Sequence, residues 1–240
     1  MCGRYAFFTP IEAVARLFGA VEYPADGLAP RYNIAPTQQV PVVRWSASHD
    51  RDAETPPLRV LSLARWGLVP SWAKDPAIGN RMINARGETA SEKPAFRAAF
   101  RQRRCLVPAD GFFEWQKSGS GKQPWFIRAA DGQPMAFAGL WETWSPAGGE
   151  PMHSCTIITT AANGFMRPLH DRMPVILDAA GREAWLDRAA SNDVLEPLLA
   201  PAPDDALEAW PVSRAVNRPA NDDAELLEPV SAGGSISPGA

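Results

Sequence analysis

Several features that would assign this chain to other protein classes are missing from its sequence. No run of about 18 apolar residues occurs, so neither a membrane-spanning helix nor a membrane partner is predicted. The opening MCGRYAFF lacks a basic region followed by a long apolar core, the pattern of a secretory signal. We therefore expect a cytoplasmic protein.

Cysteine is scarce, and its spacing excludes two further classes. Cys2, Cys105 and Cys155 have neither an even count nor CxxC spacing, which argues against a disulfide framework and a zinc knuckle. No HxxxH or CxxC partner accompanies the adjacent His170 and Asp171, so a metal hydrolase is not predicted either. We expect free thiols, no metal and no cofactor.

The composition is that of a folded chain with many loops. Of its 240 residues, 45% are hydrophobic and 21% charged, which argues against extensive disorder, and 24 prolines indicate many turns. We expect one domain over residues 2–230, a monomer, and a flexible tail over 231–240, where the sequence is SAGGSISPGA.

Short runs of β-branched and aromatic residues predict a sheet-dominated core. The runs lie at 40–45, 58–64, 105–107, 125–128, 135–140, 156–160 and 174–177. Helical patterns between them, at 94–103 and 182–188, are too few for a repeating strand-helix unit. The predicted fold class is α+β: a mixed, mostly antiparallel, sandwich- or barrel-like sheet core flanked by short helices.

A further short helix is predicted directly after the N-terminus. Thr9 is expected to cap it, Pro10 to occupy its first position and Gly19 to end it.

Charge is unevenly distributed along the chain, although the formal net charge is only -3. Residues 81–104 hold seven basic side chains against two acidic ones, whereas Asp and Glu dominate from residue 177 onward. Such a chain can present one cationic groove to phosphates while another face stays acidic. A solvated basic helix would explain the same segment equally well.

Cys2 carries the most distinctive chemistry of the chain. Removal of Met1 would leave a free α-amine and a thiol on adjacent carbons, with pKa values of about 7.7 to 8.0 and about 8.5. An aldehyde condenses with such an amine to an imine, and the thiol then closes a five-membered thiazolidine ring. Internal cysteines cannot react in this way. The alternative is that Cys2 is an ordinary residue at a frayed terminus.

Six segments, in order, carry a resemblance to a known family. They are MCGRY (1–5), RYNIAP (31–36), WGLVPSW (66–72), INARGET (83–89), CLVPADGFFEW (105–115) and HDRMP (170–174). Together they resemble the SOS response-associated peptidase family, also called the abasic-site processing family, over residues 1 to about 230. The resemblance implies a single mixed domain whose exposed Cys2 captures abasic DNA, with Asn84, Glu114 and His170 as its active-site companions.

Each companion has a physical role to fill. Glu114, between two aromatic residues, is expected to have a pKa raised by desolvation and to act as general acid and base. The alternative is a carboxylate that pairs with an arginine. His170 would protonate an oxygen as the abasic sugar opens, although a lone histidine often satisfies only a local hydrogen bond. Asn84 would orient the Cys2 amine or a reacting oxygen.

DNA contacts are predicted next to these residues. Arg4, Arg86 and Arg172 would hold phosphates, because guanidinium groups match phosphate oxygens. Trp66 and Trp72 would stack on bases or wedge beside the missing one, with a buried core position as the alternative for each. Asn33 and Pro36 are expected to shape a loop at the groove and are counted with the DNA-binding residues.

The predicted function is covalent capture of abasic sites in single-stranded DNA, as a sensor that shields them during the DNA damage response. Removal of Met1 by self-processing and a lyase step that cuts the strand are compatible with the same residues. Two alternatives are an N-terminal nucleophile thiol peptidase and a non-enzymatic, reversible binder of damaged single strands. In a bacterium, we expect such a protein to associate with the nucleoid.

Overall fold

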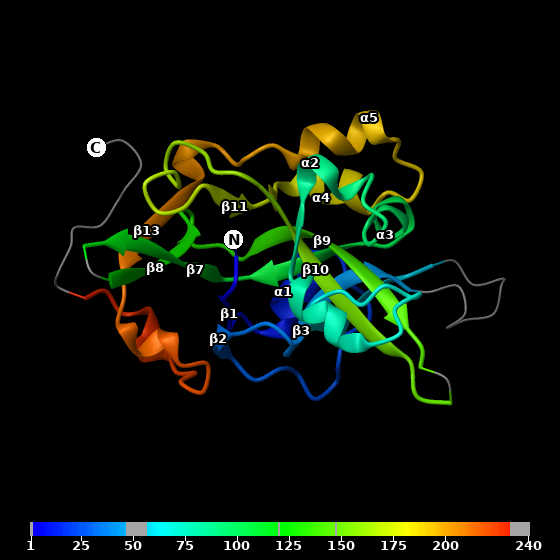
Figure 1. The fold of residues 1–240 in the computed structure, drawn as a ribbon, viewed down its shortest axis with the longest axis horizontal. Helices are drawn as coiled ribbons and strands as arrows, with labels where there is room; N and C mark the ends of the chain where they lie inside the picture. The colour runs from blue at the N-terminus through cyan, green and yellow to red at the C-terminus, as the bar shows by residue number, and fades with distance from the viewer. Residues whose placement is uncertain (1, 47–56, 120, 147, 231–240) are drawn as a thin grey trace.

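The computed structural model describes residues 2–46, 57–119, 121–146 and 148–230, which form two β-sheets with short helices around them (Figure 1). The predicted tail at 231–240 lies outside the described residues.

The smaller sheet has five strands, each antiparallel to its neighbour, in the order β13-β8-β7-β1-β2. It places the N-terminal strand β1 beside β7, so that Tyr5 pairs with Phe112. The strands are β1 (Tyr5–Phe7), β2 (Arg31–Ile34), β7 (Gly111–Ser118), β8 (Gly121–Ala129) and β13 (Leu207–Pro211).

The larger sheet closes on itself. Its path runs β11-β10-β4-β3-β6-β9-β12, and β9 also pairs with β10, so β10, β4, β3, β6 and β9 form a five-stranded ring. Only β4 and β5 run parallel to β10 among the paired strands described. The strands are β3 (Gln39–Trp45), β4 (Arg59–Trp66), β5 (Asn84–Arg86), β6 (Arg104–Ala109), β9 (Met135–Trp144), β10 (Met152–Ala161), β11 (Arg172–Pro174) and β12 (Ile176–Leu177).

The helices are short. They are α1 (Ile11–Leu17), α2 (Gly87–Ala90), α3 (Arg97–Gln102), α4 (Ala179–Leu186) and α5 (Asn192–Leu195). Figure 1 shows α2 to α5 gathered at one side of the sheets. No helix in the described ranges is long and apolar enough to cross a membrane.

These elements confirm the predicted fold class of mixed, mostly antiparallel sheets with a few short helices. The start of α1 differs from the prediction, because Pro10 takes the N-cap position and no side chain caps the helix. The Thr9 hydroxyl instead donates to Asp110 Oδ1. Gly19 ends the helix as expected, with a φ of 68° in the left-handed region that favours glycine.

A large apolar cluster joins the two sheets and reaches the start of β1. The buried Tyr5 ring packs edge-on against Trp66 at 5.3 Å and against Phe137 at 6.4 Å. Cys2 belongs to the same cluster. Packing of the β1 side chain of Tyr5 against residues of the larger sheet therefore holds the N-terminal residues in the interior.

Candidate functional site

Cys2 lies three residues before β1 and is fully buried, with 0% of its surface exposed. Burial raises the pKa of its thiol well above the ordinary value, although the Arg4 backbone N–H donates to the sulfur and acts in the opposite direction. The expectation of an exposed Cys2 is therefore wrong for this chain, which still carries Met1. A thiol in this setting stays protonated near neutral pH.

Asn84 lies directly against the main chain of Cys2. Strand β5 pairs in parallel with β10, Asn84 opposite Ile157, and this register turns the amide toward the N-terminus. Asn84 Nδ2 donates to the Cys2 carbonyl oxygen at 2.8 Å. Asn84 Oδ1 is buried and accepts no hydrogen bond from any described residue. The Asn84 side chain thus binds the Cys2 main chain through Nδ2, and Oδ1 remains available as a hydrogen-bond acceptor.

Glu114 lies on β7, opposite Trp125 of β8, and is 3% exposed. Burial raises the pKa of its carboxyl to about 7. Its charge also raises the pKa of the Cys2 thiol, an effect smaller than that of burial. A carboxyl with a pKa near neutrality can both give and take a proton.

His170 lies in the turn before β11. Burial lowers the pKa of its imidazole, which favours the neutral ring. Nδ1 accepts the Arg172 backbone N–H at 2.9 Å, so in the neutral ring the proton belongs on Nε2. Asp171 Oδ1 is 2.8 Å from the same Nδ1, but that side chain is 87% exposed and water screens its charge. Asp171 also raises the pKa of Glu114, an effect smaller than that of burial.

The Arg172 side chain is already bonded to other residues of the protein. Its guanidinium makes a two-pronged ion pair with Glu88 on α2, and Nη2 also donates to the Thr159 carbonyl oxygen at 2.6 Å. The pair lowers the pKa of Glu88. Phosphate binding by Arg172 stays a prediction, and it would require the Glu88 pair to open. Arg86, at the end of β5, is exposed.

Arg4 and Asn33 are held together at the other side of Cys2. Arg4 Nη1 donates to Asn33 Oδ1 at 2.7 Å and to the Val216 carbonyl oxygen at 2.8 Å. Asn33 is 0% exposed, and its Nδ2 donates to the carbonyl oxygens of Val216, Arg218 and Asn221. The expected role of Asn33 in shaping a loop at the groove stays a prediction, and with no exposed surface its side chain cannot contact DNA directly. Its amide ties the C-terminal segment to β2.

The two tryptophans of the WGLVPSW segment have different environments. Trp66 is 0% exposed and donates from Nε1 to the Ile83 carbonyl oxygen at 2.9 Å, so the prediction that it stacks on bases is wrong. Trp72 is 60% exposed, and stacking by its indole stays a prediction. Pro36 is half-buried in the turn between β2 and β3, next to Thr37 with its φ of 75°.

Sequence reasoning missed a shallow cavity beside these residues. Arg4 and Trp115 line it together with Lys122, Arg214 and Asn217. Trp115 follows Glu114 directly in the GFFEW segment, a signal that could have drawn attention to it. The other three residues come from β8 and from the short turn η4 (Arg214–Asn217), and only the fold brings them to β7.

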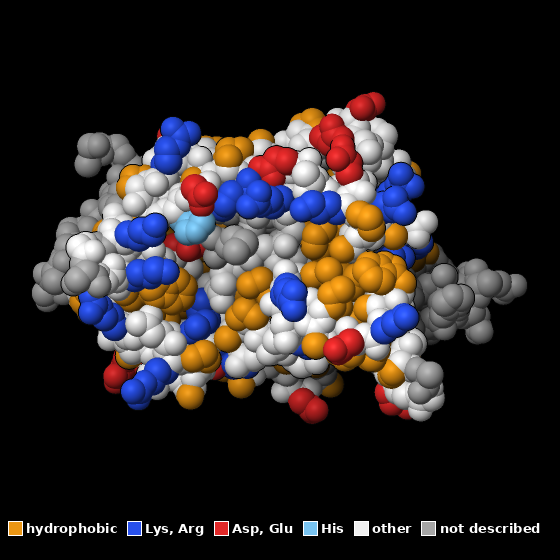
Figure 2. Space-filling model, viewed as in Figure 1, with side chains coloured by type: hydrophobic (Ala, Val, Ile, Leu, Met, Phe, Trp, Pro, Cys, Tyr) orange, Lys and Arg blue, Asp and Glu red, His pale blue; other side chains and the backbone are white. Residues whose placement is uncertain are grey.

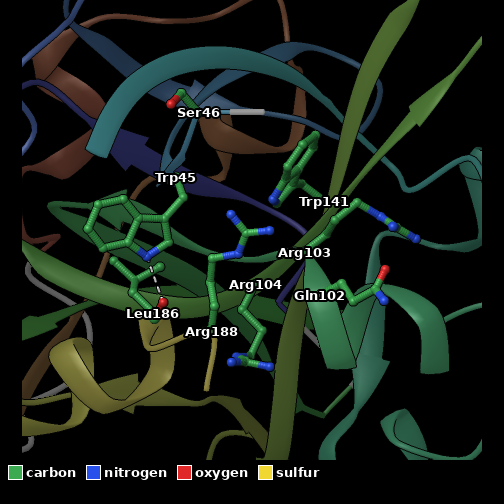
Figure 3. Close-up of a pocket in the computed structure, with 8 residues that line it drawn as sticks. All are labelled: Trp45, Ser46, Gln102, Arg103, Arg104, Trp141, Leu186 and Arg188. Carbon is green, nitrogen blue, oxygen red and sulfur yellow. Dashed lines mark hydrogen bonds between the residues drawn. The ribbon is translucent and has the colours of Figure 1, made fainter. Parts of the chain in front are cut away.

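A second cavity, of about 170 Å³, lies elsewhere between β3, α3, β9 and the end of α4 (Figure 3). Trp45, Arg104 and Trp141 are among its lining residues. Arg104 is 6% exposed, and its guanidinium donates to four backbone carbonyl oxygens. These hydrogen bonds stabilise the ends of α3 and α4, so this cavity has a structural role and is not the candidate site.

The described residues contain no group of three or more His, Cys, Asp or Glu side chains that could hold a metal ion. Figure 2 shows Lys and Arg side chains distributed around the part of the surface where Figure 1 marks the N-terminus.

An α+β fold with a penultimate cysteine, held by an amide next to a carboxyl of near-neutral pKa, defines a protein with an N-terminal thiol site. The chain belongs to the SOS response-associated peptidase (SRAP) family, whose model matches residues 1–219.

Curated relatives extend over nearly the whole chain. It is 43% identical to "Abasic site processing protein YoaM" of Bacillus subtilis, covering 95% of this chain and 98% of that one. It is 32% identical to "Abasic site processing protein YedK" of Escherichia coli, covering 96% and 100%. A crystal structure of a protein from Bacteroides thetaiotaomicron matches with a TM-score of 0.84 at 25% identity, covering 95% and 100%.

Proposed function

We propose that this chain processes abasic sites in DNA by forming a covalent link between Cys2 and the ring-opened aldehyde of the abasic sugar. Relatives over nearly the full length bear the name abasic site processing protein. The observation that carries the proposal is the Asn84 hydrogen bond to the Cys2 carbonyl beside the buried Glu114 carboxyl. Single-stranded DNA is the proposed partner, because the lesion must reach a buried N-terminus.

The reaction begins after hydrolysis of the Met1–Cys2 peptide bond, which consumes one water and frees the Cys2 amine. The amine nitrogen adds to C1′ of the aldehyde, and the resulting carbinolamine loses water to give an imine. The nitrogen keeps its proton as an iminium, the Cys2 sulfur adds to the iminium carbon, and the thiol proton passes to Glu114. The product is a thiazolidine, and the two partners together lose one water.

Each neighbouring residue has one task in this sequence. Glu114 protonates the departing hydroxyl and takes the proton back from the thiol, because its pKa of about 7 allows both transfers. His170, neutral and protonated on Nε2, donates to the sugar ring oxygen as the ring opens. Asn84 holds the Cys2 main chain and offers Oδ1 to the amine.

Denaturing gel electrophoresis of the protein mixed with single-stranded DNA carrying one abasic site tests the proposal. A heat-stable shifted band is expected with the abasic strand and not with an intact strand. Cys2→Ala should abolish the band. Cys2→Ser is the matched control, because it keeps the amine and a small side chain but lacks the sulfur, and it should yield only a link that heat reverses.

The proposal is wrong if protein lacking Met1 forms no such band. Binding of the abasic strand that persists in Cys2→Ala without any covalent product would then favour a reversible binder. Cleavage of peptides that is indifferent to added abasic DNA would favour a thiol peptidase.

A further inference from the structure

An apolar groove lies where the end of α1, the strand β12, the start of α4 and the turn between β8 and β9 meet. Its volume is about 530 Å³, and ligand sites typically measure about 300 to 1,000 Å³. Of its 17 lining residues 12 are apolar, and six of these are alanines. Because alanine side chains are short, the groove has room for a larger apolar side chain, whose burial would remove apolar surface from water.

Hydrogen bonds hold the walls of the groove in place. One wall is the short turn η3 (Asp204–Ala206), whose Ala206 carbonyl oxygen accepts the Ala130 backbone N–H at 3.0 Å. Just before it, the carbonyl oxygens of Ala202 and Pro203 accept hydrogen bonds from Asn163 Nδ2 at 2.9 and 3.1 Å. An occupant would therefore meet a preformed surface, and little binding free energy would be lost in ordering it.

The rim of the groove is acidic. Asp131, Asp178 and Asp205 are exposed, and none of them makes an ion pair with a described residue. Asp131 and Asp178 each accept one backbone N–H, which orients their carboxylates. The one cation of the lining, Arg182, lies over the Phe18 ring at 5.1 Å from its centre. Three carboxylates and one guanidinium give the rim a net charge of -2.

This charge determines what kind of ligand the groove can bind. Carboxylates repel phosphate, so the groove does not suit a nucleic-acid strand. Asp178 and Asp205 belong to the acidic part of the chain from residue 177 onward, which the proposed function does not use. An apolar floor with an acidic rim is complementary to an apolar side chain that has lysine or arginine beside it.

Strand β12 adds main-chain groups to the groove. It is the last strand in the path of the larger sheet and pairs only with β9 among the described strands. Its two residues, Ile176 and Leu177, both line the groove. An extended peptide can hydrogen-bond to the free edge of such a strand while its side chains enter the hollow beside it. This edge favours a peptide over a small amine as the ligand.

We propose that this groove docks a peptide segment of a partner protein in which a large apolar side chain is flanked by lysine or arginine. The apolar side chain lies over the alanine floor, and the basic side chains pair with Asp131 and Asp205 at the rim. The proposal goes beyond the proposed function, since the lining residues of the groove do not include Cys2, Asn84, Glu114 or His170.

Selection from a random heptapeptide library tests the proposal without a prior choice of sequence. The immobilised full chain is one target, and the Ala130→Leu variant, which narrows the groove from an exposed position, is the other. The wild-type protein should enrich peptides that carry large apolar residues next to lysine or arginine, and Ala130→Leu should not. Equal urea midpoints for the two proteins would show that the variant is folded.

Fluorescence anisotropy of the most enriched peptide, labelled with fluorescein, gives the affinities. Asp131→Asn and Asp205→Asn should each weaken binding about two- to fivefold near 0.1 M salt, as expected for exposed ion pairs. Ala130→Leu should weaken it more than about tenfold, because it blocks the position of the apolar anchor. Asp193→Asn, which removes an exposed carboxylate of α5 outside the groove, should bind like wild type.

Three results would overturn the proposal. The first is a selection in which no peptide is enriched, or in which the enriched peptides lack lysine and arginine or bind Ala130→Leu as tightly as wild type. The second is a dimer that sedimentation detects in wild type and not in Ala130→Leu, because a second copy of the chain would then cover the groove. The third is displacement of the peptide by single-stranded DNA, which would place the peptide on a DNA-binding surface instead.

Discussion

Two cavities in this molecule are lined by arginine and tryptophan, yet they differ in what their cations already bind. In the cavity of Figure 3, Arg104 donates to carbonyl oxygens of Phe100, Arg101, Trp185 and Asp187, at the ends of α3 and α4. In the shallow cavity at Arg4 and Trp115, Lys122 and Arg214 are exposed and have no such partners among the described residues.

The comparison indicates that a cation whose hydrogen-bond partners lie within the protein stabilises the fold, whereas a cation without such partners is available to a ligand. A buried guanidinium that satisfies four carbonyl oxygens cannot leave them without a large free-energy cost. An exposed cation with no protein partner costs the fold little and can bind an anion. The following predictions test that division, beginning with the largest effect.

Arg104→Gln should lower the free energy of unfolding by roughly 3 to 5 kcal/mol, because it leaves buried carbonyl oxygens at two helix ends without a donor. Urea unfolding followed by tryptophan fluorescence measures this loss. Lys122→Gln is the matched control and should stay within about 0.5 kcal/mol of wild type. A loss below about 1 kcal/mol in Arg104→Gln would contradict the structural role given to this cavity.

Glu114→Gln should slow covalent capture about a hundredfold, the lower end of what general acid-base catalysis contributes. In the wild-type protein the rate should rise as the Cys2 amine loses its proton and fall as Glu114, with a pKa of about 7, loses its own. The falling limb should vanish in the variant. Rates from quenched gel assays between pH 5 and 9 provide the measurement, and a falling limb that survives in Glu114→Gln would exclude Glu114 as the acid.

Glu114→Gln should also have a higher free energy of unfolding than the wild-type protein at high pH. The pKa of Glu114 rises from 4.5 to about 7 on folding, so the folded state holds its proton more tightly and stability is lost as pH rises between those values. The loss is complete above pH 7 and amounts to roughly 3 kcal/mol. Glu114→Gln should therefore unfold at higher urea than wild type at pH 8 and not at pH 4.5. Equal midpoints at pH 8 would argue that the carboxyl is not desolvated.

Glu88→Gln should remove the ion-pair partner of Arg172 and leave its guanidinium available to phosphate. Loss of the ion pair frees Arg172, and the salt slope for single-stranded DNA should steepen by about 0.7, with binding a few-fold tighter near 0.1 M salt. Glu92→Gln removes an exposed negative charge from the same segment without freeing an arginine, and its salt slope should match wild type. Identical slopes in both variants would mean that Arg172 does not reach phosphate.

The positions of most strands were predictable from the sequence, whereas contacts between residues far apart in the sequence were not. Runs of β-branched and aromatic residues predicted β3, β4, β6, β8, β9 and β10, because strand propensity acts within a few residues. The motif segments indicated Cys2, Asn84 and Glu114, and the fold brings these into mutual range. The closure of β9 onto β10 depends on pairing across the whole barrel, which periodicity does not encode.

The errors concern side chains whose partners are distant in sequence. Trp66 is buried because β1 packs across it, and Asn33 is buried because the C-terminal segment returns to β2. Arg172 is paired with Glu88 of α2, so its phosphate binding stays a prediction that requires this pair to open. For all three residues the partner lies tens of residues away or more in the sequence, which the residue type alone does not indicate.

The central claim is that both the amine and the thiol of Cys2 bond to one carbon of the abasic sugar. Intact mass spectrometry of the purified adduct, formed without any reducing agent, tests it most directly. The expected mass is that of the protein without Met1 plus that of the DNA, less one water, and iodoacetamide should no longer alkylate the Cys2 sulfur. An adduct that survives only after borohydride reduction, with Cys2 still open to alkylation, would contradict it.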